Sequence, residues 1–175
     1  MSRAVRFAPL AVFLVIVIAL IWRLATPTST FVPSRLEGKP LPAFDLGPGV
    51  DTKPALSTRD FADGQPHILN IFASWCVPCV SEVKVLQELK ARGAAIEGIA
   101  IRDTPEDVAA FLARNGDPYD RIGSDPQSAL QIALGSSGVP ESFIIDGRGV
   151  IRYQHIGPIE RSDIGMIEHK LEQAR

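Results

Sequence analysis

The fold of this 175-residue chain is decided by the stretch ILNIFASWCVPC, residues 68–79. Its first six residues are almost wholly apolar, which is typical of a strand buried on both faces. From Val77 to Arg92 apolar residues recur near helical spacing, and Gly93 follows them as a stop signal. Two cysteines therefore stand where a strand gives way to a helix, and this placement indicates dithiol–disulfide exchange.

Cys76 and Cys79 are the only cysteines in the sequence. Cys76 is expected at the N-terminus of the helix, where unpaired N–H groups and the helix dipole favour a thiolate. A zinc half-site is one alternative, but zinc needs about four ligands and only His67, His155 and His169 remain. A purely structural disulfide is another, but so small a loop constrains the unfolded chain weakly. We favour a redox pair with no metal and no cofactor besides its own disulfide. Cys76 then attacks a partner disulfide and Cys79 resolves it.

An apolar segment precedes the redox motif. Residues 7–22 carry no charged or strongly polar side chain, with Arg3 and Arg6 before them and Arg23 after them. The segment is short for a membrane-spanning helix of ~20 residues and long for the ~7–15 apolar residues of a signal peptide. We expect residues 1–25 to be a retained single-pass anchor in a bacterial inner membrane, with a cleaved signal as the alternative. Because two arginines precede the segment, the rest of the chain is expected in the periplasm, where disulfides persist.

The remainder of the chain is expected to be one domain on a linker. Residues 26–42 carry four prolines, and this composition predicts an extended linker over residues 26–40, followed by a domain over residues 41–175. Three of the 18 lysines and arginines lie in residues 1–30, where no acid occurs, so the rest holds 15 basic and 20 acidic residues. Such a domain lacks the basic face that phosphate binding requires, so no nucleic-acid partner is expected.

Strands and helices alternate along the domain. We expect strands at residues 41–46, 67–73, 95–101, 142–146 and 150–155, and helices at residues 77–92, 104–116, 125–135 and 161–173. Helices between strands imply parallel crossovers, and the glycines around Arg148 imply a final antiparallel hairpin. This order, with Cys-x-x-Cys after an early strand, predicts an α/β thioredoxin-like fold in which helices flank a central mixed sheet.

Pro140 stands just before the expected strand 142–146. In thioredoxin folds a cis proline occupies this point, opposite the cysteine pair. Its position therefore predicts a cis Val139–Pro140 bond, although most X-Pro bonds are trans. Because proline has no N–H and bends the chain, the backbone of Val139 is expected to be free to pair with a substrate strand.

Three polar residues are candidates for tuning the thiols. Asn70 lies six residues before Cys76, where thioredoxin has a buried Asp that relays protons. An amide cannot titrate, so Asn70 either tunes the site or is a hydrogen-bonded core residue. Glu82 lies one helical turn after Cys79 and would accept or return a proton, unless it is a solvated helix residue. Glu141 is a second acid near the thiols and carries the same two interpretations.

Two apolar residues flank the nucleophile. Trp75 and Pro78 are expected to shape the surface around Cys76. For Trp75, ordinary apolar packing is the alternative.

At these residues the chain resembles the CcmG/DsbE family of membrane-anchored thiol–disulfide interchange proteins. The resemblance covers about residues 38–171 and the N-terminal segment, through GKPLPAF (38–44), NIFASWCVPC (70–79) and NGDPYD (115–120). Its most specific part is GVPESFIID (138–146). Ser136 and Ser137 depart from the family pattern, which has an aromatic residue in this stretch.

The resemblance implies a dithiol reductant in cytochrome c maturation. Members of this family keep the haem-binding cysteines of apocytochrome c, or the haem-delivery chaperone, reduced, and a transmembrane thiol–disulfide carrier supplies their electrons. It further implies Cys76 as nucleophile, Cys79 as resolving thiol, Pro140 as the cis residue, and Glu82 and Glu141 as acidic tuning groups. Two other functions stay open: a general periplasmic disulfide reductant, and a copper-binding module for oxidase assembly, which usually needs a histidine positioned with the cysteines.

Overall fold

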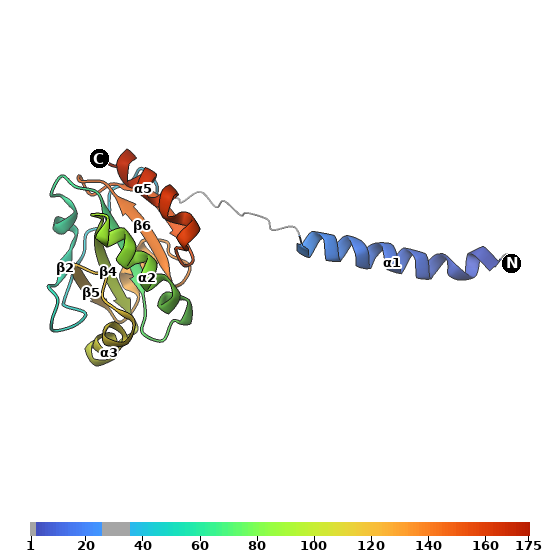
Figure 1. Cartoon of the computed structure of the whole chain (residues 1–175), viewed down its shortest axis with the longest axis horizontal. Coiled ribbons are helices and arrows are strands. Elements are labelled where there is room, and N and C mark those ends of the chain that lie inside the picture. Colours follow the sequence, from blue (N-terminus) through green and yellow to red (C-terminus); the bar gives the residue numbers. More distant parts are fainter. Residues whose placement is uncertain (1–2, 26–35) are drawn as a thin grey trace. The chain divides into compact units, whose positions relative to one another are not determined.

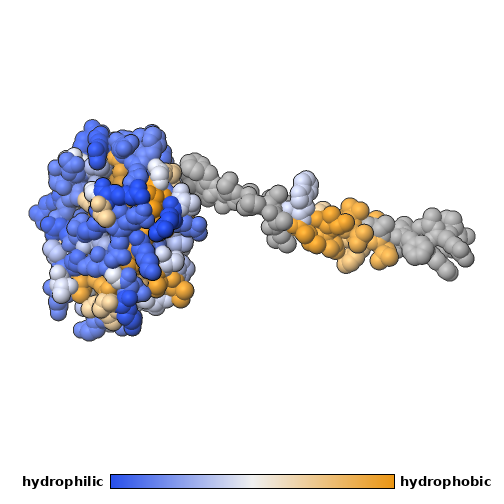
Figure 2. Space-filling view, viewed as in Figure 1, coloured by the Kyte–Doolittle hydropathy of each residue, from blue (hydrophilic) through white to orange (hydrophobic). Residues whose placement is uncertain are grey.

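The computed structural model describes residues 3–25 and 36–175 (Figure 1), which fall into two units that are treated separately. The first unit contains helix α1 (Arg3–Ala25). Its described side chains, between Leu10 and Trp22, are apolar and mostly exposed (Figure 2). Among the described residues, no helix combines the length and apolarity that crossing a membrane requires. Residues 26–35, most of the expected linker, lie outside the described part of the chain.

A five-stranded mixed sheet forms the centre of the second unit, with its strands in the order β5-β4-β3-β6-β7. The strands β3 (His67–Phe72), β4 (Ala95–Ile101) and β5 (Arg121–Asp125) run parallel, as the helices that connect them require. Strand β6 (Glu141–Ile145) is antiparallel to β3 and also pairs with β7 (Ile151–Ile156). The predicted α/β thioredoxin-like fold, with its terminal hairpin, is confirmed.

Helices and a small hairpin cover the sheet. The helices are α2 (Val77–Ala91), α3 (Pro105–Asn115), α4 (Ala129–Ala133) and α5 (Ile164–Gln173), the last preceded by the 3-10 turn η2 (Arg161–Asp163). Helix α2 contacts both α3 and α5, and Figure 1 shows it lying across the strands. The antiparallel pair β1 (Asp45–Leu46) and β2 (Leu56–Ser57), followed by η1 (Thr58–Phe61), packs beside β5.

The structure adds strand β5, which the sequence does not predict. Its five residues include only one large apolar side chain, Ile122, so no strand pattern stands out. Tertiary pairing supplies what the local sequence lacks. β4 lies on one side of β5, and on the other side the Gly49 N–H donates to the Ile122 carbonyl at 2.7 Å.

Asp125, at the end of β5, accounts for the shortness of the helix expected at residues 125–135. Its carboxylate accepts hydrogen bonds from the backbone N–H groups of Ala129, Leu130 and Gln131. It therefore caps α4 from outside the helix, and α4 begins only at Ala129.

Residues 36–40, which the proline content assigns to the linker, are bound to the folded unit. The Gly38 N–H donates to the Ile151 carbonyl at 2.7 Å, and the Ile151 N–H donates to the Lys39 carbonyl at 2.9 Å. Pro40 bridges to Val150 in the same antiparallel arrangement. This segment therefore covers the first part of the outer edge of β7.

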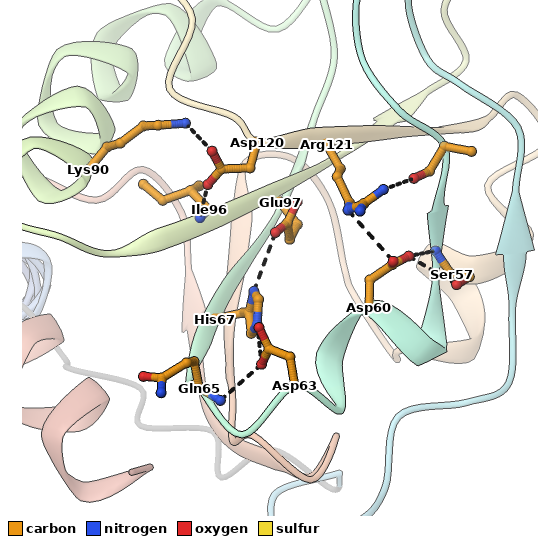
Figure 3. Close-up of polar contacts among 11 residues, drawn as sticks. Ser57, Asp60, Asp63, Gln65, His67, Lys90, Ile96, Glu97, Asp120 and Arg121 are labelled. Atoms are coloured by element: carbon orange, nitrogen blue, oxygen red, sulfur yellow. Dashed lines mark hydrogen bonds and ion pairs between the residues drawn. The ribbon is translucent and has the colours of Figure 1, made fainter.

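A charged cluster lies at the N-terminal end of β3, where buried His67 points between the buried carboxylate of Glu97 and the exposed carboxylate of Asp63 (Figure 3). Its Nδ1 lies 3.3 Å from Glu97 Oε1 and its Nε2 lies 3.1 Å from Asp63 Oδ1. Burial lowers the pKa of His67, but the hydrogen bonds to both carboxylates outweigh burial and raise the pKa above its usual value. Glu97 Oε2 is buried and has no hydrogen-bond partner among the described residues. The hydrogen bond from His67 to Oε1 therefore compensates the buried charge of Glu97.

Candidate active site

The two cysteines lie at the opposite, C-terminal end of β3. Cys76 is the N-cap of α2, and its Sγ accepts a hydrogen bond from the Cys79 N–H at 3.2 Å. The pair forms a disulfide with an S–S distance of 2.10 Å and a Cα–Cα distance of 5.3 Å. Pro78 stands in the first turn of the helix, where its missing N–H costs no hydrogen bond. The predicted helix that begins between the two cysteines is therefore confirmed.

Exposed apolar side chains surround the nearly buried disulfide. Cys76 is 4% exposed and Cys79 is 1% exposed, whereas Trp75 is 54%, Val77 80% and Val80 41% exposed. A partner that approaches the sulfur atoms therefore meets exposed apolar side chains next to them in the chain. Such a surface suits a protein substrate that presents an extended segment around its own disulfide or thiol.

The loop that follows β4 is hydrogen-bonded to Trp75 and to the residue before it. The Trp75 indole N–H donates to the Arg102 carbonyl at 3.4 Å. One residue before Trp75, the Ser74 backbone N–H donates to Asp103 Oδ2 at 2.6 Å and its hydroxyl donates to Oδ1 at 2.5 Å. The strand-to-helix turn that carries Cys76 is thus held by hydrogen bonds and not by burial of the Trp75 ring.

Pro140 lies at the same end of the sheet because β6 is antiparallel to β3. The register places Glu141 opposite Ile71, next to the residues that lead into the cysteine motif. The Val139–Pro140 peptide bond is cis, as its position in the chain predicts. The Pro140 carbonyl accepts from the Gly157 N–H at 3.1 Å, and Val139 is half-buried. The Val139 backbone thus lies at the edge of the site.

Glu82 is a buried residue one helical turn beyond Cys79, and its carboxylate is held from two sides. Oε1 accepts from Asn70 Nδ2 at 2.8 Å, and Oε2 accepts from the Ile159 backbone N–H at 3.0 Å. Burial raises the pKa of Glu82 from 4.5 to about 7, against the opposing effect of these two hydrogen bonds. Of the two interpretations the sequence left open, a solvated helix residue is excluded by its 1% exposure.

Asn70 connects the strand to this carboxylate. Its Nδ2 also donates to the Ser142 hydroxyl at 3.0 Å, and its Oδ1 accepts from the Tyr119 hydroxyl at 2.8 Å. Asn70 is 0% exposed, so each of these hydrogen bonds is made out of contact with water. The amide is therefore both a satisfied core residue and a direct partner of Glu82.

Glu141 is buried as well, but the structure joins it to a loop and not to the thiols. Its Oε2 accepts from the Ser136 hydroxyl at 2.7 Å and from the Ser137 N–H at 3.0 Å. Its Oε1 accepts a hydrogen bond from the Gln154 side chain. The two serines that depart from the family pattern thus serve to fix the loop that precedes Val139.

Tyr119 and Ser142 belong to the site's hydrogen-bond network, but residue-level reasoning from the sequence did not select them. Tyr119 lies in the NGDPYD stretch, which carries part of the family resemblance but holds no residue that the sequence singles out for the site. Its hydroxyl lies far along the chain from the cysteines, so only the folded sheet brings it to Asn70. Ser142 sits within GVPESFIID, and the register that pairs it with Asn70 could have identified it.

The arrangement offers dithiol–disulfide chemistry with a proton acceptor nearby. Cys76 stands at the helix N-terminus, where a thiolate is favoured, and the Glu82 carboxyl takes up or releases a proton near neutral pH. Across the described residues, no three His, Cys, Asp or Glu side chains lie close enough together to share a metal ion.

Comparison with known proteins assigns the chain to a family. The Redoxin family model matches residues 36–171. The chain is 37% identical over 164 residues to thiol:disulfide interchange protein DsbE of Escherichia coli K12, covering 91% of this chain and 88% of that protein. It is 36% identical over 159 residues to thiol:disulfide interchange protein HelX of Rhodobacter capsulatus, covering 91% and 90%.

The structural comparison agrees. A crystal structure described as a DsbE-type thiol:disulfide interchange protein of Chlorobium tepidum superposes with a TM-score of 0.65 at 27% identity, covering 79% of this chain and 96% of that one. Together with the Cys76–Cys79 disulfide at the start of α2, these matches make the chain a thiol:disulfide oxidoreductase. The chain belongs to the DsbE (CcmG) family of thiol:disulfide interchange proteins.

Proposed function

We propose that this protein is a dithiol reductant of cytochrome c maturation. Its substrates are the haem-binding cysteines of apocytochrome c, or the chaperone that delivers haem to them. The observation that carries the proposal is the 37% identity with DsbE over 91% of the chain, supported by the cysteine pair at the N-terminus of α2. Two features beside the disulfide support a protein substrate: the exposed apolar side chains of Trp75, Val77 and Val80, and the cis Val139–Pro140 bond.

In the proposed reaction the reduced protein passes two electrons to a partner disulfide. Of the two protons that the partner sulfurs take up, one comes from the Cys79 thiol through Glu82 and the other from solvent, which received the Cys76 proton when the thiolate formed. The Cys76 thiolate attacks one partner sulfur, the partner S–S bond breaks, and the released partner sulfur takes up a proton. The Cys79 thiol then gives its proton to the Glu82 carboxylate, and its thiolate attacks Cys76 Sγ. The mixed disulfide breaks, the second partner sulfur leaves and is protonated, and Cys76–Cys79 is the oxidised product.

The partners and the location are part of the same proposal. A transmembrane thiol–disulfide carrier returns two electrons to the Cys76–Cys79 disulfide after each cycle. The apolar residues of α1, from Leu10 to Trp22, act as a single-pass anchor in the bacterial inner membrane, and the redox domain lies in the periplasm. The Val139 backbone pairs with the substrate strand, and Trp75 and Pro78 shape the surface that receives it.

The equilibrium redox titration of Cys76 and Cys79 tests the direction of electron flow. A potential between about −270 and about −200 mV is expected, because a reductant must hold its dithiol against an oxidising compartment. A value near −120 mV, about that of DsbA, would make the protein a disulfide donor and refute the proposal.

Substrate choice is tested separately. A dedicated reductant should reduce a peptide that carries an oxidised haem-binding Cys-x-x-Cys motif much faster than it reduces insulin. Comparable rates on both substrates would favour a general periplasmic disulfide reductant.

A further inference from the structure

Tyr119 lies in the turn before β5, yet its side chain reaches the centre of the fold. It is 1% exposed and stacks on Phe72, with the ring centroids 4.7 Å apart and the planes at 14°. Gly98 leaves room for the pair, since a Cβ there would lie 2.9 Å from the Phe72 ring and 3.0 Å from the Tyr119 ring. The ring is thus held on two sides, and its hydroxyl is held 2.8 Å from Asn70 Oδ1.

We propose that Tyr119 is a positioning residue for the exchange reaction, whose hydroxyl fixes which end of the Asn70 amide faces the Glu82 carboxyl. This inference rests on the proposed role of Glu82 as proton acceptor for Cys79. The two ends of an amide exchange by rotation about one bond, and only their hydrogen-bond partners distinguish them. The Tyr119 hydroxyl donates to Oδ1, and Nδ2 donates to Glu82 and to Ser142. With the amide turned round, the buried hydroxyl could only accept, and its proton would have no other acceptor among the described residues.

The orientation of the amide decides the proton affinity of Glu82. With Nδ2 facing it at 2.8 Å, the carboxylate receives a hydrogen bond that favours the charged form. With Oδ1 facing it, the carboxylate would meet a lone pair, and the protonated acid would be favoured because it can donate. Without the Tyr119 hydroxyl the second orientation becomes accessible, so the pKa of Glu82 should rise further above its usual range.

Among the described residues, few other charged groups contact Glu82, so a change in its pKa can be assigned to the Asn70 amide. The titratable groups around Glu82 include Tyr119, across the Asn70 amide, and the two cysteines at the start of its helix. The segment that supplies the Ile159 N–H also carries Glu160 and follows His155, whose Nε2 lies 3.3 Å from the Pro158 carbonyl. Behind Tyr119, Asp117 lies 2.7 Å from Lys53, so these two charges compensate each other. The remaining partner of Glu82 is the backbone N–H of Ile159, which does not titrate.

The test is a site-resolved titration of the oxidised full chain, labelled with ¹³C at glutamate side chains and kept in detergent. In the oxidised protein the cysteines do not titrate, so the Glu82 carboxyl signal reports its own pKa. Tyr119→Phe should move the midpoint upward by about one unit, a tenfold change in proton affinity. Tyr153→Phe, which removes the only other tyrosine hydroxyl in the sequence, should leave the Glu82 midpoint unchanged.

Two further measurements separate positioning from a merely structural role. If Tyr119 acts only through the amide, Tyr119→Phe should add no shift in an Asn70→Ala background, and an equal shift there would overturn the proposal. In the reduced protein, the pH profile of disulfide closure should move upward with the Glu82 midpoint. An unchanged Glu82 midpoint in a folded Tyr119→Phe protein, or a shifted midpoint with an unchanged closure profile, would also overturn it. Failure of the wild-type protein to exchange disulfides would instead refute the proposed function.

Discussion

Replacing Glu82 with glutamine is expected to remove a loss of stability that the wild-type protein undergoes as the pH rises. Desolvation raises the pKa of Glu82 in the folded protein from 4.5 to about 7, although the Ile159 N–H and Asn70 oppose it. In the unfolded chain the carboxyl ionises near 4.5, so between these values the folded state binds more protons. The contribution of this group to stability is therefore full below pH 4.5, falls as the pH rises to about 7, and is constant above.

The size of the effect follows from the two pKa values. A difference of about 2.5 units, at about 1.4 kcal/mol per unit, gives a total loss of about 3.5 kcal/mol in the free energy of unfolding. Glu82 is 1% exposed, so solvent screening does not reduce this figure appreciably. The amide of the Glu82→Gln variant carries no charge at any pH, so this part of the pH dependence should vanish.

Urea unfolding of the oxidised full chain, at a series of pH values from about 5 to about 8, measures the effect. The disulfide keeps the cysteines from titrating. His67 also makes stability fall with rising pH, but it does so in both proteins and cancels in their difference. The drop between these two pH values should be about 2.5 kcal/mol larger in the wild type than in Glu82→Gln, because part of the full effect falls below pH 5. Parallel stability curves would refute the reasoning, because Glu82 would then ionise alike in both states.

Cys79→Ala should trap the mixed disulfide on Cys76 as a covalent adduct on a non-reducing gel, whereas Cys76→Ala should form none; adducts in both variants would contradict the assigned roles. Ser136→Ala should lower the free energy of unfolding by about 1 kcal/mol, because buried Glu141 loses a donor, and an unchanged urea midpoint would count against that contact. His67→Gln should flatten the fall in stability above pH 6.5. Because the pKa of His67 is raised in the folded protein, its contribution to the free energy of unfolding is full below pH 6.5 and is lost as the pH rises through the folded pKa. If His67→Gln lost stability above pH 6.5 as steeply as the wild type does, His67 would not be the source of this pH dependence.

The parts of the fold that the sequence predicts correctly are those with local signals. Strand β3 is a mostly apolar run, and α3 is capped by Thr104, whose hydroxyl accepts from the Asp107 N–H at 3.2 Å. Strand β5 carries no such signal, because its place depends on β4 and on the segment around Gly49. A strand fixed by its neighbours in space leaves no period in its own residues.

The site divides in the same way. The positions of Cys76 and Pro140 follow from where they stand relative to a strand end, and the structure places both at one end of the sheet. The burial of Glu82 does not follow from its position on the helix, since helical spacing alone allows either face. Only the packing of α2 on the sheet turns this carboxylate inward, toward Asn70.

The position of the buried acid bears on how the exchange site works. Thioredoxin carries its acid on the strand, and here that position holds Asn70, which cannot titrate. The acid stands instead on α2, as Glu82, one turn beyond Cys79 and hydrogen-bonded to the Asn70 amide at 2.8 Å. The strand residue thus still acts on the acid, but as a donor whose orientation is set by Tyr119. A proton acceptor on the same helix as the resolving cysteine keeps a fixed distance from it whatever the partner does to the surrounding loops, because helical backbone hydrogen bonds hold both residues.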